Sequence, residues 1–329
     1  MATQFEQDLI EDRPSDRLRD QFRADVLTGL RQRQKVVPAR WFYDLRGSEL
    51  FEEITRLPEY YPTRAEIEIL ANQCSEIGAA VGEGRAVVEF GAGSATKTPL
   101  LLDCIAPAAY VPIDISGEFL REACKPLARR YPDLPIVPVE GDFTHPLTLP
   151  GEVGGSPVLG FFPGSTIGNL APAEAVDLLR AMRATLGDGS VLLIGMDMIK
   201  DRQILLDAYD DGAGVTAAFN LNLAARINRE LDGDIPIDAL RHNIVWNVER
   251  ARIEMHLEAV RDIAFEICAQ HFAMRAGETI HTENSHKYDL ASATQLLLAG
   301  HWTPFAHFQD SERRFMVLLA RADAGLMTA

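Results

Sequence analysis

The sequence predicts an α/β protein, a Rossmann-like doubly wound parallel sheet with a smaller α+β domain inserted into it. Three observations predict this fold. A buried apolar run ends in a G-x-G turn within residues 86–98. Strand-like and helix-like segments then alternate as far as residue 199, which is typical of parallel sheets with helical crossovers. Beyond Lys200 the apolar residues change to period-two runs, which indicate antiparallel strands.

The first expected strand, AVVEF, leads into the turn that organises the chain. Gly91 and Gly93 allow a bulky ligand to approach the backbone, and the N–H groups that start the next helix can face it. A dinucleotide fingerprint requires a third glycine where Thr96 stands. The turn therefore favours a smaller nucleotide such as S-adenosylmethionine over NAD, although alone it also fits an ordinary strand-to-helix connection.

Acidic residues close the next two expected strands. Asp114 ends the second strand, 21 residues after Gly93, where a ribose diol is expected to be bound. The same carboxylate is also placed to cap the following helix. Asp142 and Phe143 follow the third strand, and they suit the exocyclic amine and the ring face of an adenine.

Apolar periodicity and turn residues along the rest of the chain predict the other elements and the domains. A polar loop at residues 163–170 follows the fourth strand, at the edge where α/β sheets bind ligands. The expected helices cover 22–30, 99–105, 117–130, 172–186 and 290–299, and the strands 86–90, 110–113, 136–139, 158–162, 191–194, 303–309 and 313–320. We expect residues 1–62 to form the N-terminal helical part of a substrate domain, 63–199 and 288–329 a cofactor domain, and 200–287 an inserted α+β substrate domain.

Aromatic residues gather before the glycine turn. Tyr60 and Tyr61 lie between Pro58 and Pro62, so they are expected on a rigid loop. Loop aromatics with polar tips often face a ligand, although core packing explains any single aromatic of this region equally well.

Composition excludes several classes of protein. The net charge of −16 disfavours a nucleic-acid partner. No apolar run is long enough to span a membrane, and a charged N-terminus is unlike a secretory signal. Four scattered cysteines argue against a disulfide framework and against a zinc ribbon, which favours the cytoplasm. The sequence does not determine the oligomeric state, and a monomer is the working expectation.

One group near the carboxyl end resembles a metal site. His281, Glu283 and His286 carry suitable ligands. Strand alternation, however, places His281, Glu283 and Ser285 on one face and His286 on the other, so no metal is expected. The same alternation directs Glu283 and Ser285 together toward a pocket, whereas a solvated strand face is the alternative for Glu283.

Several long motifs together resemble a known family. The chain is similar to the histidine Nα-methyltransferases of ergothioneine biosynthesis, S-adenosylmethionine-dependent enzymes, from Lys35 onward. The matching stretches are RWFYD, ITRLPEYYPTR, VEFGAGSATKT, GSTIGNL, YDDGAGVTAAFN, RIEM and TENS. The resemblance implies a class I methyltransferase sheet and trimethylation of the histidine α-amino group to hercynine.

The resemblance also implies roles for individual residues. It implies that Asn169 and Tyr209 hold the α-carboxylate and that Glu283 and Ser285 hold the imidazole. Residues implied to bind the cofactor are Tyr43, Gly91, Lys97, Asp114, Asp142 and Phe143, and the glycine turn adds Gly93. Residues implied to line the histidine site are Phe51, Tyr60, Gly164, Thr166, Asn169, Tyr209, Met255, Glu283 and Ser285.

The residues fit a reaction that needs positioning rather than covalent catalysis. Methyl transfer to an amine is an in-line displacement, and orientation alone can contribute ~7–11 kcal/mol. Tyr43 and Tyr60 are the expected catalytic residues, because they can steer the amine and stabilise a methylated ammonium by cation–π contact. Methylation of another aromatic amino acid such as tryptophan, a nucleotide-binding regulator without activity, and a dehydrogenase remain as alternatives.

Overall fold

The computed structural model describes residues 14–93, 96–115, 117–153 and 155–323. Ser94 and Ala95 of the glycine motif, and Ser116 before the expected helix, lie outside the described residues. The chain forms two compact units. Unit 1 contains the described residues up to Glu59, Leu205–Trp246 and Ile253–Asn284, and unit 2 contains Tyr60–Ile204, Asn247–Arg252 and the described residues from Ser285 on.

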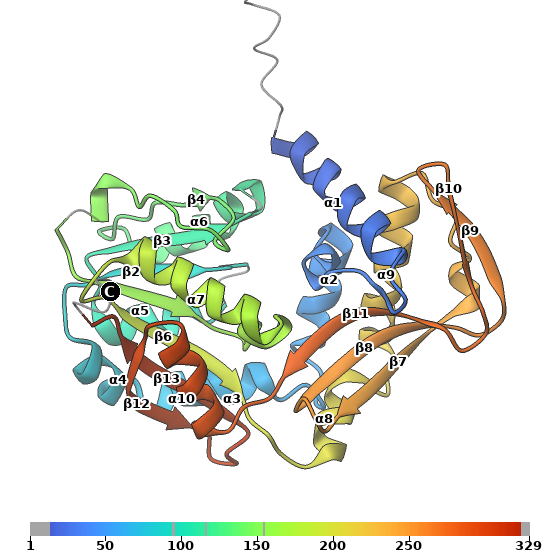
Figure 1. The fold of residues 1–329 in the computed structure, drawn as a ribbon. Coiled ribbons are helices and arrows are strands. Elements are labelled where there is room, and N and C mark those ends of the chain that lie inside the picture. Colours follow the sequence, from blue (N-terminus) through green and yellow to red (C-terminus); the bar gives the residue numbers. More distant parts are fainter. Residues whose placement is uncertain (1–13, 94–95, 116, 154, 324–329) are drawn as a thin grey trace, which may run out of the picture. The chain divides into compact units, whose positions relative to one another are not determined.

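Unit 2 is built on a seven-stranded sheet in the order β12-β13-β6-β5-β2-β3-β4 (Figure 1). Five strands are parallel, while β13 runs antiparallel to β6 and β12 antiparallel to β13. The strands are β2 (Ala86–Phe90), β3 (Ala109–Asp114), β4 (Val139–Glu140), β5 (Val158–Phe162), β6 (Val191–Asp197), β12 (Thr303–Gln309) and β13 (Phe315–Arg321). This topology confirms the expected doubly wound class I sheet and its terminal hairpin.

Helices cover both faces of this sheet because its central strands are buried on both sides and mostly apolar. In β2, Val87 packs into one core and Val88 into the other, as strand alternation requires. The core around Val87 includes residues of α3 (Pro62–Asn72), α4 (Cys74–Val81) and α5 (Thr98–Ile105). The core around Val88 includes residues of α7 (Pro172–Leu186) and α10 (Leu290–Ala299), and α6 (Gly117–Arg130) precedes β4.

The third expected strand is shorter than its apolar pattern suggested. Only Val139–Glu140 form β4, and Ile136 makes an isolated bridge to Tyr110. Pro138 lies between the bridge and the strand, and it has no N–H to donate to a ladder. The expectation of a continuous strand over 136–139 was therefore wrong.

The cysteine expectation was also wrong for one pair. Cys74 in α4 and Cys104 in α5 form a disulfide, with their Cα atoms 5.3 Å apart. The two cysteines are 30 residues apart in sequence, so no sequence pattern indicated that the helices carrying them are in contact. The bond joins α4 to the helix that follows the glycine turn.

Unit 1 contains a four-stranded sheet in the order β1-β11-β8-β7 and a separate antiparallel hairpin of β9 and β10. The two residues of β1 pair in parallel with β11, so the N-terminal segment joins the strands expected near the carboxyl end. The helices are α1 (Pro14–Leu30), α2 (Leu45–Ile54), α8 (Arg202–Tyr209) and α9 (Val215–Glu230), and the strands are β1 (Lys35–Val36), β7 (Leu240–Asn247), β8 (Arg252–Ala259), β9 (Ile263–Ile267), β10 (Gln270–Met274) and β11 (Thr279–His286). A few terminal residues of α8, β7, β8 and β11 fall in unit 2.

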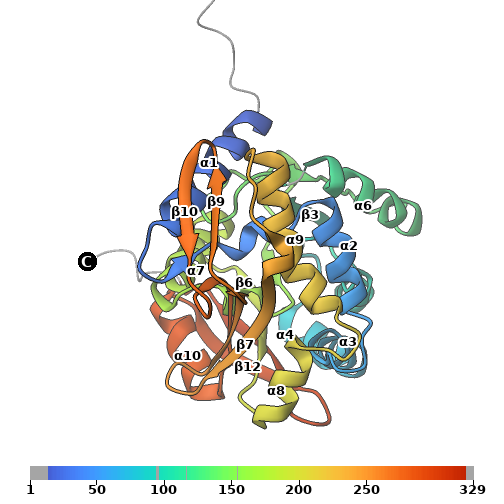
Figure 2. The ribbon, with the colours of Figure 1, turned by 90° about the vertical axis from the view of Figure 1, so that its right-hand side faces the viewer.

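Backbone hydrogen bonds join the β9–β10 hairpin to the segment that follows α9 (Figure 2). The Cys268 N–H donates to the Leu231 carbonyl at 3.1 Å, and the Asp234 N–H donates to the Glu266 carbonyl at 3.1 Å. Short 3₁₀ turns complete the fold: η2 (Ala39–Phe42), η3 (Gly151–Val153), η4 (Thr166–Asn169) and η5 (Ile237–Ala239). Across the described ranges, none of the helices has the length and apolar character that crossing a membrane requires.

Candidate cofactor and substrate sites

The glycine turn of unit 2 has the backbone geometry that a nucleotide site needs. Gly91 and Gly93 have φ angles of +69° and +50°, which side-chain-bearing residues rarely adopt. The Gly93 N–H donates to the Asp114 carboxylate at 3.3 Å, so the turn and the end of β3 are joined. A Cβ on Gly93 would meet nothing nearer than 3.9 Å, and one on Gly91 would reach the Phe143 ring at 3.5 Å. The turn thus fits a ligand that occupies the space next to the backbone.

A buried acid inside β2 supports this turn. The Glu89 carboxylate accepts hydrogen bonds from the Thr98 and Tyr110 hydroxyls, both at 2.7 Å. Burial raises the pKa of Glu89 to about 7, because the apolar surroundings disfavour its charged form more than the two hydroxyls favour it. Thr98 starts α5, so Glu89 ties the strand before the turn to the helix after it.

Lys97 and Gly164 share a buried carboxylate. Lys97 forms an ion pair with Glu66 of α3, whose side chain is 1% exposed. The Gly164 N–H donates to both oxygens of the same carboxylate, at 2.9 and 3.1 Å. Glu66 therefore connects the loop after β2 with the loop after β5, two loops expected to contact cofactor and substrate.

The expected adenine residues form a turn and an aromatic wall. Asp142 accepts from the Thr144 N–H at 3.0 Å and from its hydroxyl at 2.6 Å. Phe143 packs edge-on against Phe90 and Phe162, with ring centres 6.1 and 6.0 Å apart. The Phe143 ring is thus fixed beside Gly91.

The loop after β5 is held in place by its own residues and by its neighbours. Ser165 in this loop has a φ angle of +57°, and its hydroxyl accepts from the Asp197 N–H at 2.9 Å. Thr166 donates to the Pro163 carbonyl at 3.2 Å, and Asn169 ends η4. A Cβ on Gly168 would come within 2.9 Å of the His286 carbonyl, so a glycine is needed there. This packing holds the GSTIGNL loop against the chain that leaves β11.

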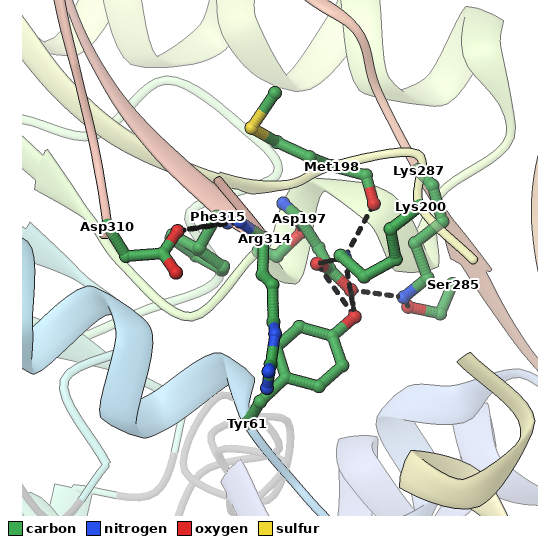
Figure 3. Close-up of polar contacts among 10 residues, drawn as sticks. Tyr61, Asp197, Met198, Lys200, Ser285, Lys287, Asp310, Arg314 and Phe315 are labelled. Carbon is green, nitrogen blue, oxygen red and sulfur yellow. Dashed lines mark hydrogen bonds and ion pairs between the residues drawn. The ribbon is translucent and has the colours of Figure 1, made fainter. Parts of the chain in front are cut away.

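A charged cluster lies at the end of β6 (Figure 3). Asp197 is 1% exposed and pairs with both Lys200 and Lys287, the latter at 2.7 Å. The Tyr61 hydroxyl donates to the two Asp197 oxygens at 2.8 and 3.0 Å and accepts from Lys200 at 2.6 Å. Burial alone would raise the pKa of Asp197, but the two ammonium groups lower it below its ordinary value. Lys287 also donates to the Ser285 hydroxyl at 2.7 Å.

Unit 1 holds an aromatic group around α9. Tyr43 packs edge-on against Phe51 and Phe219, with ring centres 5.6 and 5.8 Å apart. Phe42 stacks on the same Phe219 ring at 4.5 Å. Tyr43 is nevertheless 44% exposed, which is unusual for a residue with such neighbours.

The unit 1 sheet holds the remaining expected residues. Met255 is buried, and its carbonyl accepts from the Thr282 hydroxyl at 3.0 Å. The Tyr209 carbonyl accepts from His242 at 2.8 Å, which fixes the end of α8. His281 donates to the Glu283 carbonyl at 2.9 Å and thereby holds the backbone of that residue.

Three potential metal ligands come together in unit 1, and they differ from the trio considered on sequence. Glu254, His256 and His281 offer donor atoms within 4.8 Å of one another. The His256 ring bonds Thr279 at 3.2 Å and Glu254 at 3.3 Å, and it stacks on His281 at 4.7 Å. These hydrogen bonds account for the group without an ion.

The structure thus gathers the expected residues into two sets. Unit 1 contains Tyr43, Phe51, Tyr209, Met255 and Glu283, and unit 2 contains Tyr60, Gly91, Gly93, Lys97, Asp114, Asp142, Phe143, Gly164, Thr166, Asn169 and Ser285.

Comparison with known proteins shows the family of the chain. The sequence model of the family described as "Histidine-specific methyltransferase, SAM-dependent" matches residues 22–322. The chain belongs to this family. It is 44% identical to a histidine N-alpha-methyltransferase of Mycolicibacterium smegmatis, over 83% of this chain and 86% of that protein. It is 42% identical to a histidine N-alpha-methyltransferase of Mycobacterium tuberculosis, over 84% and 88%. It is 27% identical to ergothioneine biosynthesis protein 1 of Neurospora crassa, over 82% of this chain and 32% of that protein.

For this member of the histidine-specific methyltransferase family, several buried polar residues were not singled out from the sequence. They are Glu66, Glu89, Ser165, Asp197, Lys200 and Lys287. Two weak signals existed. Asp197 ends a strand as Asp114 does, and Lys287 follows Ser285 by two residues, the spacing of one strand face.

Proposed function

We propose that this protein is an S-adenosylmethionine-dependent methyltransferase that trimethylates the α-amino group of L-histidine to hercynine, a step of ergothioneine biosynthesis. The observation that carries the proposal is the 42–44% identity to two histidine N-alpha-methyltransferases over more than four fifths of the chain. Within the fold, the open glycine turn, Asp114 at the end of β3 and Asp142 two residues after β4 support it.

Unit 2 would hold the cofactor. Gly91, Gly93 and Lys97 would surround its methionine portion, and Asp114 would accept from the ribose hydroxyls. Asp142 would accept from the adenine amine and Phe143 would cover the ring face. The positive φ angles of the two glycines and the fixed Phe143 ring support these roles.

The amino-acid substrate would be held by the residues that the family resemblance implies. Asn169 and Tyr209 would bind the α-carboxylate, and Glu283 and Ser285 the imidazole. The other members of the proposed pocket are Phe51, Tyr60, Gly164, Thr166 and Met255. Unit 1 would thus be the substrate domain and unit 2 the methyltransferase domain.

Positioning would carry most of the rate enhancement. S-adenosylmethionine, held by the residues named above, would supply the methyl group as an electrophilic carbon on a sulfonium, and the amine nitrogen would form the new N–C bond as the S–C bond breaks. Tyr43 and Tyr60 would orient the neutral amine. The ammonium form of the substrate would first lose a proton to solvent. Their ring faces would stabilise the methylated ammonium by ~0.5–2 kcal/mol each.

A mass assay tests the proposal. The protein is incubated with S-adenosylmethionine and each amino acid separately, and the masses of the products are measured by mass spectrometry. We expect gains of one to three methyl groups on histidine. Gains on tryptophan with none on histidine would overturn the assignment, and cofactor binding without any methylation would indicate a regulatory protein.

Two further expectations stay predictions. The protein is expected to act in the cytoplasm as a monomer on a free amino acid, with no nucleic-acid partner. Cell fractionation and light scattering of the purified chain test them.

A further inference from the structure

Ser285 lies beside a lysine that nothing in the proposed chemistry uses. The Lys287 ammonium is 0% exposed, and it donates to the Ser285 hydroxyl at 2.7 Å (Figure 3). An ammonium group has donors only, so the Ser285 oxygen must be the acceptor in this bond. The single proton of the hydroxyl then points away from Lys287, toward a different acceptor.

The backbone and the ion pair fix this lysine. The Lys287 N–H donates to the Ala251 carbonyl at 2.7 Å, and the next N–H, of Tyr288, donates to the Asp197 carbonyl at 2.8 Å. The ammonium pairs with the Asp197 carboxylate at 2.7 Å. The direction of the Ser285 hydroxyl is therefore set by a rigid buried cluster.

We propose that Lys287 is a positioning residue that keeps the Ser285 hydroxyl as a hydrogen-bond donor, so that the site selects the neutral imidazole of its substrate. This inference rests on the proposed function, in which Ser285 meets one ring nitrogen and Glu283 the other. An imidazolium has N–H groups on both nitrogens and cannot accept from Ser285. A neutral ring accepts from Ser285 and donates to Glu283, so one tautomer is selected.

The charges around the pair reinforce this choice. Two ammonium groups, Lys200 and Lys287, surround one carboxylate, Asp197, so the cluster has an excess of positive charge. The other titratable groups near it are Tyr61, Arg250, Arg252, His286, Tyr288, Asp310 and Arg314. A second positive charge beside Ser285 is disfavoured by this excess.

Two groups of the cluster have pKa values away from that of the substrate ring. Burial lowers the pKa of His286 to about 4, and burial lowers the pKa of Lys200 to about 8. The imidazole of the substrate has an ordinary pKa of about 6.5. The part of a change in histidine affinity between pH roughly 5.5 and 7.5 that depends on Lys287 therefore reports the substrate ring.

Calorimetry of histidine binding in the presence of S-adenosylhomocysteine tests the inference. We expect protonation of the substrate ring to contribute about a tenfold rise in the wild-type dissociation constant between pH 7.5 and 5.5, because only the neutral ring binds. In Lys287→Met the Ser285 hydroxyl can turn and accept, so this rise should shrink to about threefold or less. Equal pH profiles for wild type and Lys287→Met would overturn the proposal.

A matched variant separates positioning from structural support. Lys200→Met removes an ammonium from the same Asp197 carboxylate, but Lys200 has no bond to Ser285, so this variant should flatten the pH profile much less than Lys287→Met does. Each variant leaves one lysine paired with Asp197, so the charges of the remaining ammonium and carboxylate cancel. In a Ser285→Ala background, Lys287→Met should not change the profile further. If Lys200→Met flattens the profile as much as Lys287→Met, the effect belongs to the cluster and the proposal fails.

A measurement on the unaltered protein covers the case in which Lys287→Met does not fold. The ¹⁵N shifts of ring-labelled histidine, bound to the wild-type protein with S-adenosylhomocysteine at pH roughly 6, should show one neutral tautomer. Shifts of an imidazolium would overturn the inference while leaving the proposed function intact. A wild-type protein that does not bind histidine would instead overturn the proposed function.

Discussion

Asp114 has a structural partner as well as an expected ligand, because its carboxylate accepts from the Gly93 N–H. Asp114→Ala should weaken S-adenosylhomocysteine binding by ~1–3 kcal/mol, the range for a charge-assisted hydrogen bond. Calorimetry measures this loss. Asp177→Ala, which removes an acid that is 77% exposed on α7, is the control for net charge and should bind as the wild type does. Unchanged affinity in Asp114→Ala would remove this residue from the cofactor site.

Glu283 is expected to set the choice of histidine over other amino acids. A site built to bond a ring nitrogen discriminates strongly, because a substrate without that nitrogen leaves polar groups unpaired. Glu283→Ala should lower kcat/KM for histidine about 100-fold or more, and far less for tryptophan or phenylalanine. A competition assay with mixed amino acids measures both losses.

Two further variants delimit this role. Glu278 lies next to the start of the same strand, and its side chain is exposed. Glu278→Ala should therefore leave the preference for histidine unchanged. Asn169→Ala should impair all amino acids alike, since it would act on the shared α-carboxylate. Equal losses for every substrate in Glu283→Ala would contradict a role in specificity.

Among the elements, the join between β2 and α5 should make stability depend on pH through Glu89. Its pKa is about 7 in the folded protein because of burial, against an ordinary value of 4.5. Between these values the folded state holds a proton that the unfolded state has lost, so stability falls as pH rises from 4.5 to 7. The contribution is on the order of 3 kcal/mol.

Glu89→Gln removes this titration and keeps an oxygen for the Thr98 and Tyr110 hydroxyls. Urea unfolding at several pH values should give a shallower decline for Glu89→Gln than for the wild type over that range. Parallel declines in the two proteins would show that Glu89 is not the group responsible.

The disulfide between α4 and α5 should contribute measurably to stability. A bond that closes a loop of 30 residues stabilises by ~3–4 kcal/mol in the chain-entropy estimate. The double variant Cys74→Ser and Cys104→Ser should lose about this much in urea unfolding. Reductant should destabilise the wild type and leave the double variant unaffected; equal responses would contradict the bond.

Most elements were predictable because their residues carry local signals. The bounds of α6, α7, α10, β5 and β12 agree with the expected ones, since their apolar periodicity and flanking glycines or prolines are all local. The pairing of β1 with β11 was not predictable, because a two-residue strand has no period and its partner lies more than 240 residues away. The Asp197 cluster was not predictable for the same reason. Tyr61 and Lys287 are far from Asp197 in sequence, and buried polar pairs produce no periodic sequence pattern.

The site was predictable to a different extent. Glycine turns and strand-ending acids pointed to the cofactor side from chemistry alone. The substrate side depended on the family resemblance, because Tyr209, Met255 and Glu283 occupy unremarkable positions in helices and strands. Contacts that hold these residues in place, such as the bond from His281 to the Glu283 carbonyl, appear only in the structure.

At the scale of the whole molecule, the proposed function requires that one site accept the amine three times. Each transfer adds bulk and the last leaves a permanent cation, so the pocket must hold a growing charged group without a fixed counter-charge on the nitrogen. Aromatic rings meet this need, since their faces attract a cation and tolerate any number of methyl groups. Tyr43, packed edge-on against Phe51 and Phe219 and 44% exposed, is an aromatic ring of this kind.

A time course with excess S-adenosylmethionine should therefore end at trimethylhistidine, and added mono- or dimethylhistidine should be converted to the same product. Tyr43→Leu should slow the third transfer more than the first, because the developing quaternary cation loses a cation–π partner worth ~0.5–2 kcal/mol, or about two- to thirtyfold in rate. Phe305→Leu, which alters a 40% exposed aromatic on β12, is the control. Single-turnover rates for each methylated substrate measure the ratio. A wild-type reaction that stops at monomethylhistidine would show that the pocket does not admit growing bulk, and an equal slowing of all three transfers in Tyr43→Leu would place Tyr43 in binding rather than in stabilising the cation.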